Sequence, residues 1–344
     1  MPRFDPAQAG RKSGERAEPS MLTLVTGGAG YLGSVLCELL LRTGHRVRAL
    51  DSLLHGGRAL LGLAGREGFE FERADVRDRD AVRKALRGVD AVVHLAAIVG
   101  DPACASEPEL ARAVNLAASQ ALFAAARDAG ARRFAFASTC SNYGRMLDTS
   151  VLATEHHELR PVSLYAETKV GVEETLLAAP PRPIAATVLR LSTLYGLSPR
   201  MRFDLTVNEF VKELVVARKL VVFGEQFWRP YVHVRDAARA FATVLEAPVE
   251  LVAGQVFNVG DTKENYRKAD LLALMSERIP DADVQRVERT EDPRDYRVSF
   301  ERIQEQLGFA VTRRVPDGIE EVATALETGL IEDPADPAYY NVRS

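Results

Sequence analysis

The chain has 344 residues, and its 44 lysines and arginines are balanced by 48 aspartates and glutamates, which leaves a formal net charge of −4. This length suits one large α/β unit or one domain with a smaller partner. A chain without excess positive charge lacks the basic stripe that neutralises a nucleic-acid backbone, so a nucleic-acid partner is not expected.

Membrane and metal partners are not expected either. No uninterrupted apolar run is long enough to span a bilayer. Cys37, Cys104 and Cys140 are odd in number and lack metal-ligand spacing, which indicates reduced thiols and a cytoplasmic location. Residues 1–20 combine prolines, glycines and charges without the apolar stretch of a signal peptide, which predicts a disordered N-terminal tail.

A glycine-rich turn follows the first apolar, β-prone run, Leu22–Thr26, and opens a helix-like segment that extends to Arg42. Gly27 permits a tight turn, Gly30 lets the main chain approach a pyrophosphate, and Gly33 lets the helix pack closely against the strand. An anion is then expected at the N-terminus of the helix.

A second apolar strand, His45–Leu50, ends in Asp51, close to the spacing expected for a dinucleotide-binding βαβ unit. The Asp51 carboxylate would accept hydrogen bonds from the adenosine ribose and repel a 2′-phosphate, which favours NAD over NADP. Arg58 lies nearby in sequence and keeps NADP as the alternative.

Two further strands lead toward the same edge of the sheet. Phe69–Ala74 alternates as a half-buried strand and ends at Asp75, which either bonds the adenine amino group or caps the next helix. Asp90–Ala96 reads as a strand buried on both faces, with His94 as a packed core histidine. The segment that follows it leaves the sheet where a nicotinamide ribose would lie.

The strand Arg133–Ser138 delivers a second site-forming segment, which begins with Thr139. About one helix length later, Tyr165 and Lys169 are four residues apart and therefore share one helix face. A neighbouring ammonium and a bound cationic nicotinamide would both lower the pKa of the tyrosine and favour its phenolate, so the pair suits general-base chemistry.

Together these motifs resemble the extended short-chain dehydrogenase/reductase superfamily, and its NAD-dependent nucleotide-sugar epimerase/dehydratase family matches best, from about residue 21 to about residue 330. The resemblance implies a Rossmann-type doubly wound parallel sheet with a smaller C-terminal substrate-binding α/β subdomain. Residues 21–190 would form the NAD-binding domain, residues 231–260 would return to it, and residues 191–344 would mainly form the subdomain.

The resemblance also implies roles for individual residues. Tyr165 would remove a sugar hydroxyl proton, Lys169 would hold the nicotinamide ribose, Thr139 would hydrogen-bond the same hydroxyl, and Asn115 would support the cofactor side of the pocket. The cofactor would contact Gly27, Gly30, Tyr31, Leu32, Gly33, Asp51, Asp75, Val76, Leu95, Ala96, Ala97, Asn115, Ser138, Tyr165 and Lys169.

The two positions after Thr139 bear on the reaction, because relatives that eliminate water or decarboxylate place an acid there. Cys140 and Ser141 stand at these positions, and neither is a carboxylic acid, which disfavours 4,6-dehydration and decarboxylation. Cys140 is interpreted first as a small buried residue, with an acid/base thiol as the alternative.

The second half of the chain supplies the substrate side. Thr193 stands where the family usually has asparagine, Asp204 is either a substrate contact or a helix N-cap, and Asp292 replaces the first arginine of a phosphate-binding turn. Arg229 is the main phosphate ligand expected, because an arginine fork matches phosphate geometry. The substrate, a nucleotide-diphosphate sugar, would contact Val99, Asp101, Thr139, Thr193, Asp204, Leu205, Arg229, Arg294 and Arg297.

The reaction expected from these residues is epimerisation at C4 through a transient 4-keto sugar. A 4-ketoreductase of a nucleotide 4-keto-6-deoxysugar, a 3,5-epimerase or dehydratase, and a cofactor-sensing regulator on the same fold remain as alternatives. The family also implies a homodimer, with the alanine-rich helices expected at residues 109–129 and 163–179 as its interface.

Overall fold

The computed structural model describes residues 21–146, 148, 150–289 and 294–341. The predicted tail, residues 1–20, and Asp292 lie outside these ranges. The strands of the larger sheet are β1 (Leu22–Thr26), β2 (Arg46–Asp51), β3 (Phe69–Arg73), β4 (Ala91–His94), β5 (Arg133–Thr139), β6 (Ala185–Leu191) and β10 (Gln255–Val259).

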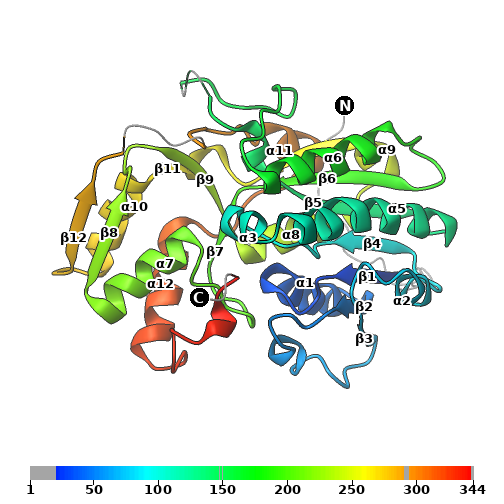
Figure 1. The fold of residues 1–344 in the computed structure, drawn as a ribbon, viewed down its shortest axis with the longest axis horizontal. Helices are drawn as coiled ribbons and strands as arrows, with labels where there is room; N and C mark the ends of the chain where they lie inside the picture. The colour runs from blue at the N-terminus through cyan, green and yellow to red at the C-terminus, as the bar shows by residue number, and fades with distance from the viewer. Residues whose placement is uncertain (1–20, 147, 149, 290–293, 342–344) are drawn as a thin grey trace, which may run out of the picture.

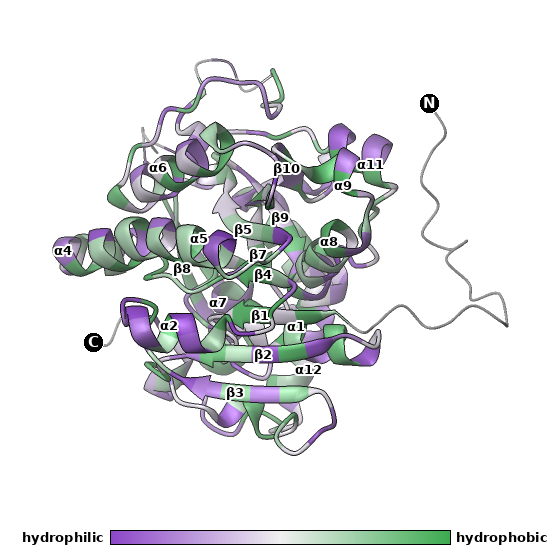
Figure 2. Cartoon of the chain, turned by 90° about the vertical axis from the view of Figure 1, so that its right-hand side faces the viewer, coloured by the Kyte–Doolittle hydropathy of each residue, from purple (hydrophilic) through white to green (hydrophobic). Residues whose placement is uncertain are grey.

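All seven strands run parallel, in the order β10-β6-β5-β4-β1-β2-β3. Helices cover both faces of this sheet (Figure 1), so the predicted doubly wound α/β fold is confirmed. Every residue of β1 is buried, as a central parallel strand requires, whereas the edge strand β3 alternates and carries hydrophilic side chains (Figure 2).

Two groups of helices pack against this sheet. Leucines of α1 (Tyr31–Arg42) share one core with apolar residues of α8 (Val234–Glu246). A second core joins α2 (Arg79–Ala85), α5 (Ser119–Asp128) and α6 (Leu164–Ala178). Shorter helices complete this part of the chain: α3 (Asp101–Ser106), α4 (Pro108–Ala111), α9 (Val249–Val252) and α11 (Glu301–Leu307), with 3₁₀ turns at Arg58–Leu60 and Cys140–Tyr143.

The helix predicted over residues 109–129 is not a single α-helix. It consists of α4, a π-helical segment from Arg112 to Ala118, and α5. The wider turn contains Asn115, whose side chain reaches toward the segment after β4. Such π-helical turns occur often at functional sites, and this one lies beside the cavity described below.

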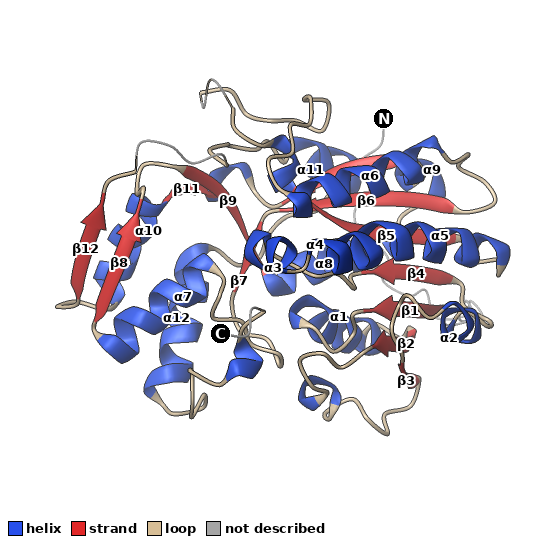
Figure 3. Cartoon of the chain, viewed as in Figure 1, coloured by secondary structure: helices blue, strands red, loops and turns tan. Residues whose placement is uncertain are grey.

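A smaller part of the molecule, on the left of Figure 3, lies beyond the carboxyl ends of the parallel strands. It contains a three-stranded sheet in the order β11-β9-β7 and a two-stranded sheet of β12 and β8. Its elements are β7 (Thr193–Tyr195), α7 (Thr206–Lys212), a π-helical turn at Glu213–Ala217, β8 (Lys219–Phe223), β9 (Trp228–His233), a 3₁₀ turn at Thr262–Glu264, β11 (Asn265–Arg267), α10 (Lys268–Arg278), β12 (Asp283–Val287), α12 (Val315–Glu327) and a 3₁₀ turn at Pro337–Tyr339.

The chain passes between the two parts more than once. After β6 it enters the smaller part, returns along α8 to add β10 to the edge of the large sheet beside β6, and leaves again into β11. The residues 231–260, which were predicted to return to the first domain, therefore include β10, the strand at one edge of the large sheet.

Candidate active site

A cavity of about 680 Å³ lies between the carboxyl ends of the large sheet and the smaller part. Ligands of open parallel sheets collect at this edge. Most residues predicted for the site line this cavity: Gly27, Gly30, Tyr31, Leu32, Gly33, Asp51, Asp75, Val76, Leu95, Ala96, Ala97, Val99, Asp101, Ser138, Thr139, Ser141, Tyr165, Lys169, Thr193, Asp204, Leu205, Arg229 and Arg294.

The glycine turn between β1 and α1 forms one end of the cavity. Gly27 has φ +74°, a left-handed conformation that favours glycine, and a Cβ on Gly33 would lie 2.0 Å from the Gly27 carbonyl oxygen. The helix α1 begins after Gly30 with no side-chain cap and no acidic residue in its first turn. Its free N–H groups and positive end therefore offer an anion site, which fits the pyrophosphate of a dinucleotide.

Asp51 lies at the end of β2 beside this turn. Its carboxylate accepts hydrogen bonds from the backbone N–H of Ala29 at 3.0 Å and of Leu53 at 2.7 Å. Burial raises the pKa of Asp51, while these two N–H groups and the charge of Arg200 oppose the shift. Arg58, which kept NADP as the alternative, does not line the cavity.

The alternative N-cap interpretation of Asp75 is wrong. Asp78 caps α2 by accepting from the backbone N–H of Asp80 and Ala81, whereas Asp75 pairs with Arg77 at 2.8 Å. The paired guanidinium holds the pKa of Asp75 below its usual value. Asp75 remains available at the cavity wall, beside Val76.

Asn115 lies behind the cavity wall, not on it. Its side-chain amide accepts from the Ile98 N–H at 2.8 Å and donates to the Ile98 carbonyl oxygen at 2.9 Å. Asn115 is buried. Asn115 is therefore not placed for a direct cofactor contact. Through Ile98 it fixes the segment that carries Ala97 and Val99, which line the cavity.

His94 is the packed core histidine that the sequence predicts. Its ring nitrogens lie 2.6 Å from Thr26 Oγ1 and 2.7 Å from Ser119 Oγ, and the residue is fully enclosed. Burial, with a smaller contribution from Lys169, lowers the pKa of His94 to about 3. The ring is therefore neutral at physiological pH and has no direct access to the cavity.

Tyr165 and Lys169 lie on one face of α6 and line the cavity with Thr139 from the end of β5. Lys169 Nζ donates to the carbonyl oxygen of Ala137 at 2.8 Å and lies 5.7 Å from the centre of the Tyr165 ring. Burial lowers the pKa of Lys169 to about 8. The arrangement brings a phenol, an ammonium and a hydroxyl to one end of the cavity.

The pKa of Tyr165 differs from the expectation. Burial raises it, and the largest opposing charge is that of Arg202, not Lys169. A phenol in a dry cavity stays neutral unless positive charge is added nearby, because desolvation disfavours the phenolate. The expected lowering of the Tyr165 pKa therefore depends on Arg202 and on further positive charge in the cavity.

Cys140 does not line the cavity. Its thiol is fully buried and donates to the carbonyl oxygen of Arg190 at 3.3 Å, and burial raises its pKa. Its position contradicts the acid/base alternative and agrees with a small buried residue. Ser141 does line the cavity, and its hydroxyl lies 3.3 Å from Tyr296 Oη.

A buried ion pair lies beside Ser138, the residue before Thr139. Arg190 on β6 and Glu173 on α6 approach to 2.7 Å, with side chains 5% and 2% exposed. Glu173 also accepts hydrogen bonds from the Ser138 hydroxyl and, at 2.9 Å, from the Asn142 amide. This network ties α6, which carries Tyr165, to the strand end that carries Thr139.

The smaller part contributes cations to the opposite wall. Arg229 lies over the Tyr296 ring, 5.3 Å from its centre, and Arg294 pairs with Asp101 at 3.0 Å across the cavity. Arg297 does not line the cavity, so the structure gives no support to its predicted substrate contact; its guanidinium lies 4.7 Å from the centre of the Trp228 ring.

Asp204 is not the N-cap of α7, because that position belongs to Leu205. Instead both oxygens of Asp204 pair with Arg202 at 2.9 Å. The carboxylate also accepts from the Asn341 N–H at 3.2 Å, and Asn341 donates to the Val99 carbonyl oxygen at 3.2 Å. The segment 337–341 therefore bridges the two parts over the cavity.

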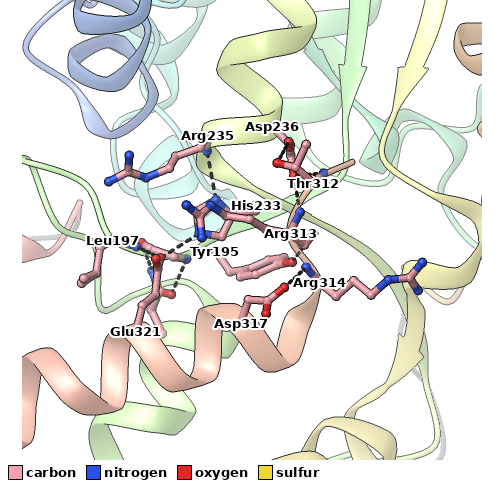
Figure 4. Close-up of polar contacts among 12 residues, drawn as sticks. Tyr195, Leu197, His233, Arg235, Asp236, Thr312, Arg313, Arg314, Asp317 and Glu321 are labelled. Carbon is pink, nitrogen blue, oxygen red and sulfur yellow. Dashed lines mark hydrogen bonds and ion pairs between the residues drawn. The ribbon is translucent and has the colours of Figure 1, made fainter. Parts of the chain in front are cut away.

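The segment after β7 is fixed at its start by a polar junction (Figure 4). Because the Arg235 N–H donates to Nδ1 of His233, we assign the ring proton to Nε2, which donates to Glu321 at 2.7 Å. Glu321 also accepts from the Leu197 N–H at 2.6 Å. Burial opposes ionisation of Glu321, but these hydrogen bonds lower its pKa overall.

Sequence reasoning missed several cavity residues. Arg202 stands two positions before Asp204, and Tyr296 stands two positions after Arg294, so each belongs to a segment that was recognised without being resolved residue by residue. Arg200 and Tyr231 likewise stand in the segments that contain Asp204 and Arg229. No local pattern marks Lys268 and Asn341, which distant packing brings to the wall.

Comparisons with known proteins agree on the family. A model of the NAD dependent epimerase/dehydratase family matches residues 23–260. A dTDP-glucose 4,6-dehydratase of Streptomyces griseus is 32% identical over 308 residues, 86% of this chain and 91% of that protein. A UDP-glucose 4-epimerase of Streptomyces lividans is 31% identical over 233 residues, 63% of this chain and 69% of that protein.

Among solved structures, a Thermus thermophilus UDP-glucose 4-epimerase in complex with NAD matches with a TM-score of 0.77. It is 28% identical, and the match covers 89% of this chain and 99% of that one. In the described ranges, no helix is both long and apolar enough to cross a membrane. Epimerases and dehydratases match at nearly equal identity, so the site residues must distinguish between these reactions.

Proposed function

Because the chain belongs to the NAD-dependent epimerase/dehydratase family, we propose that it is a nucleotide-sugar epimerase that uses NAD and acts at C4. The observation that carries the proposal is the composition of one end of the cavity. Thr139, Tyr165 and Lys169 meet there, and the two residues after Thr139 offer no carboxylic acid. Oxidation and reduction at a single carbon need one proton acceptor and no second acid.

NAD supplies a hydride acceptor and donor when it is bound. The groups that would hold it are the N-terminus of α1, the Asp51 carboxylate and Lys169. A Cβ on Gly27 would collide with the main chain of Ala96, and a Cβ on Gly33 with that of Gly27, which fits the tight turn and close helix packing of a dinucleotide-binding βαβ unit.

In this proposal, Tyr165 accepts the proton from the sugar C4 hydroxyl and later returns it. The Thr139 hydroxyl would orient the same oxygen, and the charge of Arg202 would reduce the cost of the phenolate. The cavity must let the 4-keto sugar rotate, so that hydride returns to the opposite face of C4. Arg229 and Arg294 also line this cavity of about 680 Å³, and they would bind the diphosphate while the sugar rotates.

A panel of nucleotide sugars tests the reaction. Purified protein is incubated anaerobically with each sugar, with and without added NAD or NADPH, and the products are separated and weighed by mass spectrometry. The proposal predicts a product of unchanged mass without net cofactor consumption. A product heavier by two hydrogens with matching cofactor oxidation would identify a ketoreductase, and loss of water would identify a dehydratase.

A further inference from the structure

Arg200 is a buried cation whose donors are largely unsatisfied. It lies between β7 and α7, lines the cavity and is 6% exposed. Among the residues that the structure describes, its guanidinium makes one hydrogen bond, from Nη2 to the Tyr340 carbonyl oxygen at 3.3 Å, and its buried Nε has no partner. An arginine has five N–H donors, so most donors of Arg200 have no acceptor among the described residues, and an anion in the cavity would supply one.

The neighbouring Arg202 does not share this shortage of hydrogen-bond acceptors. Arg202 is also buried, but its charge is matched by the two-pronged pairing with Asp204. Arg200 has no carboxylate in such contact among the described residues. Burial, reinforced by the charge of Arg202, lowers the pKa of Arg200 to about 10, which marks a cation short of negative charge.

Two contacts place Arg200 at the cofactor end of the cavity. Ser198, two residues earlier, donates its hydroxyl to the Tyr31 carbonyl oxygen at 2.6 Å and lies 3.2 Å from Ser34 Oγ, both in the first turn of α1. On the other side, Arg200 lies within electrostatic reach of Asp51 at the end of β2. Arg200 therefore lines the cavity near both the N-terminus of α1 and the carboxylate expected at the adenosine ribose.

We propose that Arg200 binds the pyrophosphate of NAD, opposite the N-terminus of α1. The helix end and the guanidinium would then neutralise the two phosphates from opposite sides. A 2′-phosphate is a poorer ligand for Arg200, because Asp51 would repel it. The inference rests on NAD as the proposed cofactor and does not depend on which sugar or which carbon reacts.

The assignment gives the smaller part of the molecule a role in cofactor binding. Arg200 is held from behind by the Tyr340 carbonyl oxygen, in the same segment that contacts Asp204 and Val99. NAD would then be gripped by both parts of the chain, so its release would require the segment after β7 to move away from α1.

Titration calorimetry of the full-length protein, after removal of co-purified nucleotide, tests this assignment. The ligands are NAD, ADP-ribose and adenosine, and the variants are Arg200→Gln and Arg200→Lys. Arg200→Gln should weaken binding of NAD and ADP-ribose roughly tenfold to a hundredfold, the range for charge-assisted hydrogen bonds, while adenosine binding changes less than twofold. Arg200→Lys should fall between, because it keeps the charge and loses the fork.

Arg286→Gln is the matched control, because this exposed arginine of β12 pairs with Glu225 and does not line the cavity. It should bind all three ligands normally. Unchanged affinity for NAD and ADP-ribose in Arg200→Gln would overturn the assignment. An equal loss for adenosine would show that Arg200 supports the pocket structurally and would also overturn it. No sugar turnover enters these titrations, so they succeed or fail independently of the proposed reaction.

Discussion

The two walls of the cavity differ in construction. One wall, which we call the strand wall, lies at the carboxyl ends of the parallel strands. It presents main-chain N–H groups, Thr139 and, from α6, Tyr165 and Lys169, and the buried Glu173–Arg190 pair lies behind it. The opposite wall, which we call the arginine wall, presents the long cationic side chains of the smaller part of the molecule, such as Arg229 and Arg294. Side chains held by a buried strand and a packed helix have little freedom, which suits bond-making, whereas long arginines can adapt to the position of a diphosphate.

The largest effect is expected on the strand wall, from removal of one hydroxyl. Tyr165→Phe should reduce turnover of the nucleotide sugar by roughly 10²–10⁴-fold, because the acceptor for the hydroxyl proton is lost. NAD affinity, measured by calorimetry, should stay unchanged, because the ring and Lys169 remain. Turnover within a few-fold of the parent would contradict the proposed base and favour the cofactor-sensing regulator.

Breaking the ion pair beneath the strand wall should cost stability. Glu173→Ala leaves Arg190 buried without its counter-charge and should lower the free energy of unfolding by about 3–5 kcal/mol, measured by urea denaturation. The neighbouring Glu174 is exposed on the same helix, and Glu174→Ala should change the free energy by less than about 0.5 kcal/mol. Equal effects of the two variants would show that the buried pair does not stabilise this wall.

Acid should weaken the strand wall through His94. Below pH 6.5 the unfolded chain takes up a proton that the folded His94 accepts only near pH 3, so stability falls as the pH decreases through this range. The contribution amounts to about 3 kcal/mol between pH 8 and pH 4. His94→Gln should flatten the pH dependence of urea denaturation, while the exposed His157→Gln should leave it unchanged. The same acid sensitivity in both variants would rule out His94 as its source.

The smallest effect is expected on the arginine wall, and it concerns affinity. Arg229→Lys should raise KM for the nucleotide sugar roughly tenfold with little change in kcat, because lysine keeps the charge and loses the fork. Arg297→Lys is the matched control, since that arginine also lies over an aromatic ring but not at the cavity. Equal KM values for the two variants would remove Arg229 from the diphosphate site.

Residues of the strand wall could be predicted because their positions follow from local chain chemistry. A glycine turn after a buried strand, an acid at the end of the next strand and a Tyr and Lys four residues apart each have one natural place in a doubly wound sheet. The fold was accordingly predictable. Asn115 supports the cavity wall as predicted, but it does so from behind, through Ile98 in a π-helical turn that no periodicity reveals.

Residues of the arginine wall could be recognised only in part. Arg229, Arg294 and Arg297 all stand in motif-like segments, yet packing of the smaller part sends only the first two to the cavity. Asp204 pairs with Arg202 instead of capping α7, and Arg200 lines the cavity close to where Ser198 contacts α1. These outcomes depend on contacts between segments far apart in sequence, which a local pattern does not encode.

The position of β10 has a consequence for how the protein can be divided. This strand covers the outer edge of β6, yet it follows more than sixty residues later in the chain. A fragment that ended after β6 would expose the unpaired N–H and C=O groups of an almost wholly buried strand, a template on which other chains can add. The sheet and the smaller part therefore cannot be separated by a single cut, and fragments made that way should aggregate before they bind any nucleotide.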